Sequence, residues 1–523
     1  LDVSGFMAST SELIVKPRDR IYAKLGALAI TRSIVFLYIL SFLLYVALFL
    51  LLRAKSFRLT QTLTLQMWGW LKAFSDLFTP SSFDTATWRS AQAGFHELLF
   101  AVIIVLLVGS WLRILWVLKT SNRDLKLLWI LLGALGLSIP LLLLPGMFSG
   151  DLYLYMFYGR IIAKYGDNPL IVPPNNYPGD FQLYWIYWKW LPSAYGPVWL
   201  MLSGALSAFG GDGLWSNIFS YKIAVLILHA LTTVVVWLCA RSVTPEHASW
   251  AAVFYGWNPL VLHETVGSGH NDVMVALFVS LAVLSVLRKR WLFAVFFLVA
   301  GSMVKLTTIV LLPPLLLVWL MGLESKRERL LALSKGTVVA LVSGWILYAP
   351  LWAGTALFTN SLNNPAAQRY LNSLWELILM PTMRDYFPPP TLDTLFDIIR
   401  NLLFAAFFCW MLFLTAKKRS LQWSWIWLWF GYCLTLSWIW PWYFLLLIAV
   451  IAVYNGDLES SLGVALTLGG FLFWMGWPDP PLPAAPWLYY FRSVILLGPA
   501  IAVVIIPRVQ RFMITLLGTR QVQ

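Results

Sequence analysis

The feature that most constrains this chain is the recurrence of apolar segments long enough to cross a lipid bilayer. A hydrocarbon core about 30 Å thick requires roughly 20 apolar residues of α-helix per crossing, and a helix pairs its own backbone groups in lipid. Since 60% of the residues are hydrophobic and only 11% are charged, no stretch has the composition of a soluble domain core. The sequence therefore predicts an all-α polytopic membrane protein, with one integral membrane domain over residues 30–507 and about 13 to 14 transmembrane helices. The expected segments are 30–52, 97–118, 125–145, 219–240, 249–265, 272–287, 290–304, 306–322, 335–353, 392–416, 423–440, 441–454, 460–476 and 487–507.

The basic residues indicate how these helices are oriented. The net charge is +14, but Lys and Arg form short clusters between apolar runs, at 288–290, 326–329 and 417–419. This is the pattern of cytoplasmic loops, and it argues against a nucleic-acid-binding surface. A basic segment, residues 1–29, precedes the first apolar run, and we expect it in the cytoplasm together with the tail 508–523.

The same orientation places two long loops, 146–196 and 354–390, on the outer face of the membrane. The count of crossings is consistent only if segment 198–211, which is apolar but too short to span a bilayer, does not cross alone. We therefore predict that 198–211 is a re-entrant or interfacial helix. The inner loops are short and basic, so the functional side is expected outside.

Asp151 is the candidate catalytic residue of the 146–196 loop. It follows Ser149 and Gly150 directly after a charge-free apolar run, so its carboxylate is expected where a transmembrane helix emerges. A partly desolvated carboxylate has a raised pKa and can act as a general base toward a hydroxyl group. The alternative is a helix cap, in which Ser149 or Asp151 simply starts the helix 152–165.

The segment 152–165 combines aromatic and basic residues, as interfacial helices do. Tyr158 falls near the face of Asp151, and Arg160 and Lys164 are four residues apart. These two cations are candidates for holding a lipid phosphate. The alternative for the tyrosines is anchoring in the aromatic belt of the membrane interface.

A second group of polar residues interrupts the apolar sequence around residues 267–272. His270 could hydrogen-bond a phosphate or a sugar hydroxyl, while Asn271 and Asp272 could bind substrate or cap the next helix. His263 and Glu264 are expected to face the same cavity, because they would be costly facing lipid. Lys305 is isolated in an apolar run, and it either snorkels to the surface or pairs with an anionic group such as a phosphate.

The aromatic run 437–443 suggests a further part of the site. Trp440 and Tyr443 could stack on a sugar ring or line a groove for an isoprenoid chain, or they could belong to the interfacial belt. No phosphate-binding glycine loop, dinucleotide fingerprint or zinc-ligand spacing occurs. We therefore predict no metal ligands from motifs, and a sugar donor here would be lipid-linked.

Several short motifs resemble those of the GT-C superfamily of integral-membrane glycosyltransferases, and most closely bacterial polyprenyl-phosphate-sugar-dependent mannosyltransferase-like proteins. The likeness covers roughly residues 125–325, with one further point at Pro441-Trp442-Tyr443. The motifs are Ser149-Gly150-Asp151, Tyr158-Gly159-Arg160, Gly166-Asp167-Asn168-Pro169, Tyr195-Gly196-Pro197, Asn258-Pro259-Leu260, Gly269-His270-Asn271-Asp272 and Lys305 ahead of Pro313-Pro314.

The resemblance implies a GT-C-like bundle whose large outer loop 146–196 is catalytic, with Asp151 as the base. It implies inverting transfer of mannose or another hexose or pentose from a polyprenyl phosphate to a hydroxyl of a glycan, lipid or protein. Many relatives carry a paired acidic motif where this chain has Asp151-Leu152-Tyr153, which leaves the use of a divalent metal open. The loop 354–390 is then expected to help bind the acceptor.

We expect the protein to lie in the inner (plasma) membrane, in contact with membrane lipids, with its active site on the outer face. Two other classes remain: a lipid or solute transporter or flippase, and a non-catalytic subunit of a larger membrane complex that kept the fold. A transporter predicts charges at the bilayer midplane and an inverted repeat, whereas here the charges outside the basic loops gather at one face.

Overall fold

The structure, a computed structural model, describes residues 17–54, 85–121, 124–144, 146, 149–362, 364, 370–379, 389–418, 420–476 and 486–518. Over these residues the chain is helical, and its only β-type pairing is an isolated parallel bridge between Leu371 and Trp438. The all-α prediction is confirmed. The α-helices are α1 (Pro17–Ala54), α4 (Thr85–Ser121), α5 (Leu127–Leu142), α6 (Asp151–Ala163), α7 (Pro197–Gly210), α8 (Leu214–Val243), α9 (Ala248–Gly256), α10 (Pro259–Leu262), α11 (Asp272–Leu287), α12 (Trp291–Ser302), α13 (Leu312–Met321), α14 (Lys326–Tyr348), α15 (Ala356–Leu362), α16 (Leu374–Leu379), α17 (Pro389–Lys418), α18 (Leu421–Thr435), α19 (Phe444–Tyr454), α20 (Asp457–Leu472), α21 (Pro486–Ile505) and α22 (Pro507–Leu516).

Short helical turns connect these helices. A π-helical turn covers His263–Gly267, and the remaining turns are 3₁₀ helices at Pro174–Asn176, Phe181–Trp185, Pro245–His247, Leu306–Leu311, Ala349–Leu351, Pro441–Tyr443 and Phe473–Gly476.

The chain is a multi-pass membrane protein. By length and apolar composition, five helices of the described residues could cross a bilayer, and the pair α21 and α22 would add a sixth if it formed one span bent by 99°. Several other expected crossings are apolar helices of 10–17 residues. The five long candidates are Ile30–Leu52, Leu98–Ser121, Leu214–Val243, Lys326–Leu351 and Thr394–Lys417.

Proline and capping residues explain where expected segments are broken. The segment 249–265 is interrupted after Gly256, where the Asn258 side chain caps α10 by accepting from the backbone N–H groups of Leu260 and Val261. Pro259 stands at the first position of α10, where the missing N–H costs nothing. The expected helix 335–353 instead begins earlier, at Lys326, because Ser325 and Glu328 form a capping box.

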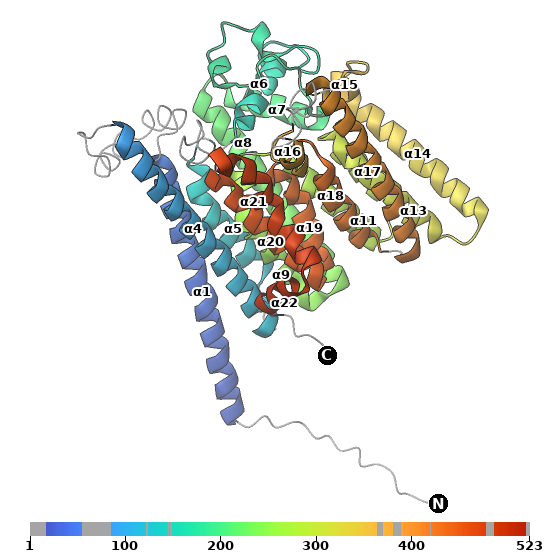
Figure 1. Cartoon of the computed structure of the whole chain (residues 1–523). Coiled ribbons are helices and arrows are strands. Elements are labelled where there is room, and N and C mark those ends of the chain that lie inside the picture. The colour runs from blue at the N-terminus through green and yellow to red at the C-terminus, as the bar shows by residue number, and fades with distance from the viewer. Residues whose placement is uncertain are drawn as a thin grey trace, which may run out of the picture.

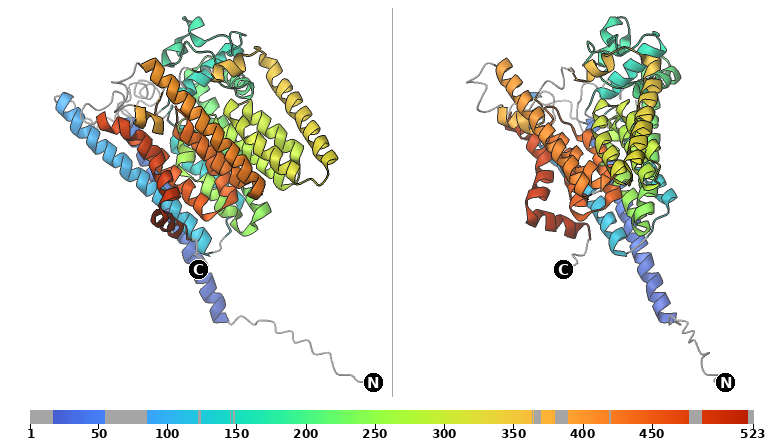
Figure 2. Two further views of the ribbon diagram at one scale, coloured as in Figure 1. Left: turned by 45° about the vertical axis from the view of Figure 1, so that its right-hand side comes forward. Right: turned by 90° about the vertical axis from the view of Figure 1, so that its right-hand side faces the viewer.

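One end of the helical body carries the segments around the predicted catalytic loop. Figure 1 shows α6 and α7 together at the end opposite the start of α1, and Figure 2 shows the same arrangement from two further directions. The α15 helix of the 354–390 segment lies at this end too. The two loops that the sequence places on one face are therefore at the same end of the molecule.

Helix α6 is held against α7 and α8 by buried hydroxyl groups. The Tyr221 hydroxyl of α8 donates to the carbonyl oxygen of Ser203 at 2.8 Å and also lies 3.1 Å from that of Tyr155. Ser207 Oγ donates to the carbonyl oxygen of Met156 at 3.1 Å. Segment 198–211, predicted as a re-entrant or interfacial helix, is α7, which packs along α6. These contacts fix the helix that begins at Asp151.

The predicted segment boundaries stay predictions, because the structure contains no membrane. Residues 1–16 of the predicted cytoplasmic segment lie outside the described residues, and α1 already begins at Pro17. The predicted tail 508–523 largely coincides with α22, which packs on α20 and α21. Of the loop 354–390, residues 363, 365–369 and 380–388 lie outside the described part.

Candidate active site

Asp151 is the first residue of α6, and its side chain is 20% exposed. Ser149 Oγ accepts a hydrogen bond from the Asp151 backbone N–H at 3.1 Å. The N-cap residue is Gly150, which has no side chain to cap the helix, so Ser149 supplies the side-chain acceptor at the helix start. The Asp151 carboxylate is therefore not used as a cap, and the helix N-terminus leaves it available for chemistry.

Two side chains approach the Asp151 carboxylate. The Tyr195 hydroxyl donates to Asp151 Oδ2 at 3.4 Å, and His270 Nδ1 lies 3.8 Å from the same oxygen. Burial raises the pKa of Asp151 to about 6; the positive charge of Lys305 and the hydrogen bonds from Tyr195 and Ser149 oppose the rise, while the negative charge of Asp272 adds to it. A carboxyl group with this pKa is ionised near neutral pH and remains basic enough to take a proton.

Lys305 lies close enough to Asp151 for its charge to act on that carboxylate, and it forms an ion pair with Asp272. Lys305 Nζ is 2.8 Å from Asp272 Oδ1 and 3.1 Å from Oδ2. The ammonium group also lies 4.3 Å from the centre of the Tyr443 ring, a cation–π contact. Asp272 begins α11 without capping it through its side chain. Of the two alternatives predicted for Lys305, the structure therefore shows pairing with an acidic side chain, and the Lys305 side chain is only 15% exposed.

The Tyr195-Gly196-Pro197 turn joins this group to the 146–196 segment. The Gly196 backbone N–H donates to the carbonyl oxygen of Val304 at 2.9 Å, and that of Val198 donates to Met303 at 3.0 Å. A Cβ atom at Gly196 would lie 2.0 Å from the Met303 carbonyl oxygen, so only glycine permits this approach. The turn thereby places Tyr195 beside Asp151. It also places Met303 and Val304, which precede Lys305, beside the start of α7.

The 354–390 segment supports the same turn. Asn360 Nδ2 on α15 donates to the carbonyl oxygens of Leu170 at 2.8 Å and Ser193 at 3.1 Å. Ser361 Oγ donates to the carbonyl oxygen of Ala194 at 3.0 Å. The described part of this segment therefore holds the backbone immediately before Tyr195, whereas the prediction that it binds an acceptor stays a prediction.

His270 is fully buried behind Asp151. Its ring stacks on Trp442, with centroids 3.8 Å apart, and its Nε2 lies 3.3 Å from Glu264 Oε2. Burial, together with the positive charge of Lys305 and the nearby His263 ring, holds the pKa of His270 well below its usual value. The imidazole is therefore neutral at physiological pH.

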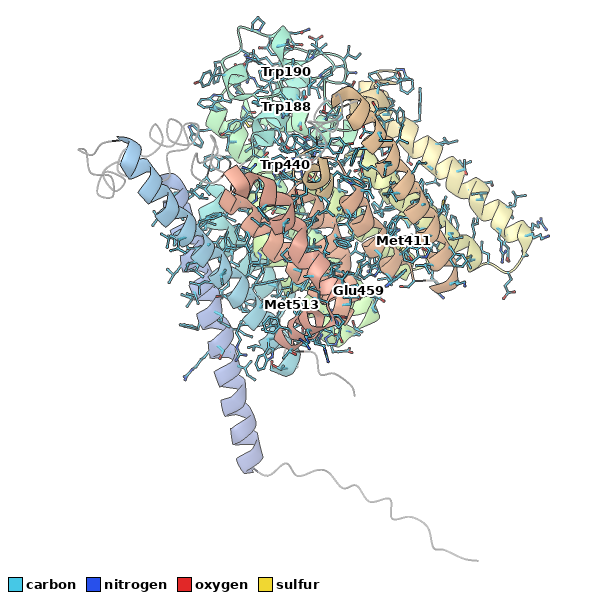
Figure 3. The ribbon with its side chains drawn as sticks, viewed as in Figure 1. Trp188, Trp190, Met411, Trp440, Glu459 and Met513 are labelled. Carbon is cyan, nitrogen blue, oxygen red and sulfur yellow. The ribbon has the colours of Figure 1, made fainter. Side chains whose placement is uncertain are left out.

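The predicted aromatic residue Trp440 belongs to a stack of rings that continues from this site. Trp440 is 7% exposed and stacks on Trp442 at 4.9 Å between centroids, while Trp438 lies 5.5 Å from Trp440 and 6.3 Å from Trp188. Figure 3 shows Trp188 and Trp190 at the end that carries α6, with Trp440 beneath them. The stack connects the loop to the His270 region. Sugar or isoprenoid contact by Trp440 and Tyr443 stays a prediction.

Arg160 and Lys164 occupy different surroundings from those predicted. Arg160 is 2% exposed, and its guanidinium pairs with Asp180 at 2.6 Å and with Asp212 at 3.0 Å. Lys164 pairs with Asp212 at 2.8 Å, and Tyr165 donates to Asp180 at 2.7 Å. Burial opposes ionisation of Asp180, but hydrogen bonds from Arg160 and Tyr165 outweigh it and lower the pKa. This geometry favours a structural role for Arg160 over phosphate binding, because its donors are already engaged.

The remaining predicted residues are Tyr158, on α6, and Asn271, directly before α11. The Tyr158 hydroxyl donates to the carbonyl oxygen of Leu191 at 2.9 Å and so holds the loop to the helix. Asn271 Oδ1 accepts from the Tyr155 hydroxyl at 3.3 Å. Neither contact tests the predicted substrate binding. No group of three or more His, Cys, Asp and Glu side chains is arranged to hold a metal ion among the described residues.

The sequence analysis did not single out two polar residues, one beside Asp151 and one at the end of α5. Tyr195 was read only as part of a turn, although a tyrosine beside Gly-Pro in an acid-bearing loop is a signal that could have found it. Lys222 of α8 is fully buried, and its ammonium group donates to the carbonyl oxygens of Leu141 and Leu144 at the end of α5. It thereby holds the segment that leads into Gly146 and Asp151. A lysine inside an apolar helix was its signal.

Most residues of this site fall within one family match. A sequence profile described as "Alpha-(1->6)-mannopyranosyltransferase, N-terminal domain" of the MptA_B family matches residues 28–321, more than half of the chain. The chain belongs to this family. The matched range contains Asp151, Tyr195, His270, Asp272 and Lys305, whereas Trp440 and Tyr443 lie beyond it. Membership confirms the predicted resemblance to mannosyltransferases.

Curated relatives of the MptA_B family are similar over part of their length. Alpha-(1->6)-mannopyranosyltransferase A of Corynebacterium glutamicum is 25% identical over 229 residues, which is 41% of this chain and 45% of the relative. The protein of the same name from Mycobacterium tuberculosis is 25% identical over 190 residues, 36% of each chain. The chain thus spans less than half the length of these relatives.

A solved structure is also similar to the chain. ArnT from Cupriavidus metallidurans, solved with undecaprenyl phosphate, is 17% identical with a TM-score of 0.40, over 75% of this chain and 77% of that one. A likeness of this size carries no argument about function.

Proposed function

We propose that this protein is a glycosyltransferase that transfers mannose, or another hexose or pentose, from a polyprenyl-phosphate donor to an acceptor hydroxyl. Family membership supports the reaction class. The observation that carries the proposal is the position of Asp151, a partly exposed carboxylate with a pKa of about 6, close to the cation Lys305. This pairs a base for the acceptor with a positive charge for the leaving phosphate.

In the proposed reaction, Asp151 takes the proton of an acceptor hydroxyl while its oxygen attacks the anomeric carbon. The bond between that carbon and the phosphate oxygen breaks on the opposite face, so the configuration inverts, and the bonding electrons leave with the lipid phosphate. Lys305 has three donor hydrogens and contacts two Asp272 oxygens, so it can also donate to the phosphate. Such preorganised charge is most effective where water is excluded.

The donor and acceptor are also part of the proposal. The donor would be a polyprenyl-phosphate sugar from the surrounding membrane, and the acceptor a glycan, lipid or protein hydroxyl. The site is proposed to face the extracytoplasmic side of the plasma membrane, because the predicted basic loops face the cytoplasm. A role within a larger membrane complex is compatible with this reaction.

The test is transfer of mannose from a polyprenyl-phosphate mannose by the purified protein in lipid nanodiscs. Asp151→Asn is expected to lower the turnover at least about 100-fold, the usual size of a general-base contribution. Asp167→Asn is the matched control, because Asp167 lies on the same loop and accepts from the Tyr177 hydroxyl, away from the site. Full activity of Asp151→Asn would refute the assignment.

A further inference from the structure

A buried chain of polar groups lies behind Asp151, and the proposed reaction does not yet use it. His270 is fully buried between two acids: its Nδ1 is 3.8 Å from Asp151 Oδ2, and its Nε2 is 3.3 Å from Glu264 Oε2. Within the described residues, neither ring nitrogen has a partner at full hydrogen-bond geometry. An imidazole directed at two carboxyl groups in this way is placed to exchange protons with them.

Glu264 is held in one orientation. Its Oε1 accepts from Trp474 Nε1 at 2.8 Å and lies 3.0 Å from His263 Nδ1. With Oε1 engaged on that side, Oε2 is the oxygen that faces His270. Glu264 and His263 are fully buried, so water does not compete for these contacts.

The backbone explains why these groups meet. His263 and Glu264 begin the π-helical turn, a form of helix that is often found at functional sites. The chain then reverses at Gly269, whose φ of +82° favours glycine, and the His270 N–H donates to the Glu264 carbonyl oxygen at 3.1 Å. The ring is clamped from one side by Trp442. Both the backbone and the side chain of His270 are thus fixed relative to Glu264.

The protonation of His270 follows from this geometry. A neutral imidazole has one N–H donor and one lone pair, and His270 stays neutral because burial and the positive charge of Lys305 lower its pKa. An N–H on Nε2 would face the Glu264 carboxyl group, 3.3 Å away, and this tautomer leaves the lone pair of Nδ1 toward Asp151. This tautomer can accept a proton from Asp151, whereas the other tautomer cannot.

We propose that Glu264 is a positioning residue that holds His270 in this tautomer, so that His270 receives the proton that Asp151 takes from the acceptor. This inference rests on the proposed function. The proton leaves the acceptor oxygen as the glycosidic bond forms and passes from Asp151 to His270 Nδ1. The anionic lipid phosphate beside Lys305 offsets the positive charge that lowers the pKa of His270 in the free protein. Asp151 is then an anion again, and the imidazolium is stabilised by Glu264. The 3.8 Å gap between Asp151 and His270 must shorten when substrate binds, as catalytic contacts commonly do.

The test is a double-mutant cycle on Glu264→Gln and His270→Gln in nanodiscs, with the mannose-transfer assay. Each single substitution is expected to lower kcat about 10- to 100-fold with the donor KM unchanged, because a misplaced proton blocks the relay and not donor binding. The double variant should be no slower than His270→Gln, since Glu264 acts through His270. Losses that multiply, or a raised KM with normal kcat, would overturn the proposal.

Two further variants separate the relay from a loss of structure. Glu459→Gln is the matched control: Glu459 is also buried and accepts from an indole, Trp427 Nε1, at 3.1 Å, but it lies far down the helical body in Figure 3. It should keep normal kcat. Trp474→Phe removes the indole N–H that orients Glu264 and keeps an aromatic ring at this position, and a several-fold fall in kcat is expected. If Glu264→Gln fails to fold, wild-type kcat in Trp474→Phe refutes the proposal.

The outcomes also distinguish this inference from the proposed function. Full activity of the Asp151→Asn variant would refute both the proposed function and the relay. An inactive Asp151→Asn with wild-type kcat in Glu264→Gln would leave the proposed function standing and refute the relay alone.

Discussion

The burial of Asp151 has a consequence for stability that can be measured. Its pKa rises from 3.8 to about 6 in the folded protein, about two units, and each unit corresponds to about 1.4 kcal/mol. The folded state therefore binds the proton more tightly than the unfolded state, so the ionised carboxylate destabilises the fold by about 3 kcal/mol. Asp151→Asn keeps the shape and removes the charge, and we expect it to stabilise the protein while abolishing transfer.

The sign of the effect sets its pH dependence. The destabilisation is complete above pH about 6, declines as the pH falls from about 6 to 3.8, and is absent below 3.8, where Asp151 is protonated in both states. The gain in stability of Asp151→Asn over the wild type should therefore be largest near pH 8 and vanish toward pH 4. Thermal unfolding in nanodiscs, followed by intrinsic tryptophan fluorescence, measures this difference.

Asp180→Asn provides a control of opposite sign on the same loop. The pKa of Asp180 is lowered, because the hydrogen bonds from Arg160 and Tyr165 outweigh burial. Its removal leaves a buried guanidinium with fewer partners, which we expect to cost roughly 3 kcal/mol at pH 8, and this loss should shrink as the pH falls. If Asp151→Asn were not stabilising at pH 8, or if its gain grew toward low pH, the reasoning about Asp151 would be refuted.

Two further predictions concern the groups around Asp151. Lys305→Met removes a charge that lowers the pKa of Asp151, so the acid limb of the pH–rate profile for transfer should move above pH 6 and the maximal rate should fall; an unchanged limb would contradict the electrostatic link. Gly196→Ala places a Cβ atom 2.0 Å from the Met303 carbonyl oxygen, so we expect a loss of about 1–3 kcal/mol in stability and reduced transfer. Gly179→Ala, with no atom within 4 Å of the new Cβ, should change stability by less than about 0.5 kcal/mol, and equal effects of the two substitutions would contradict the close approach.

Much of the candidate site could be predicted from the sequence, because burying a polar group in apolar surroundings costs free energy unless the group finds a partner. His270 and Lys305 each interrupt an apolar run, and the only inexpensive place for both is a shared polar region. The structure brings them to Asp151: His270 lies 3.8 Å from its carboxylate, and the charge of Lys305 acts on its pKa. For Asp272 the sequence predicts either substrate binding or a helix cap, and in the structure its carboxylate pairs with Lys305. The all-α fold could be predicted for the same reason, because unpaired backbone N–H and C=O groups cost free energy in lipid.

The rest could not be predicted because it depends on contacts distant in sequence. Arg160 meets Asp180 and Asp212, which lie 20 and 52 residues further along the chain, and no local pattern announces such pairs. The division of the apolar runs into separate helices also depends on single residues. A helix breaker such as Pro259 divides an apolar run into short helices that hydropathy alone reads as one crossing.

Arg160 and Lys305 differ in their surroundings. This difference explains how one end of the molecule can hold its helices rigidly and also keep a cation that acts on Asp151. Arg160 is surrounded by carboxylates, so its charge is neutralised within the protein and it serves to hold Asp180, Asp212 and the end of α6 together. Lys305 has one acid, Asp272, and keeps a net influence on Asp151. A phosphate dianion approaching this end would therefore gain more from Lys305 than from Arg160, because Arg160 is 2% exposed and already pairs with two carboxylates, whereas Lys305 pairs with one. The raised pKa of Asp151 follows from the same arrangement, since Lys305 lowers it less than burial raises it.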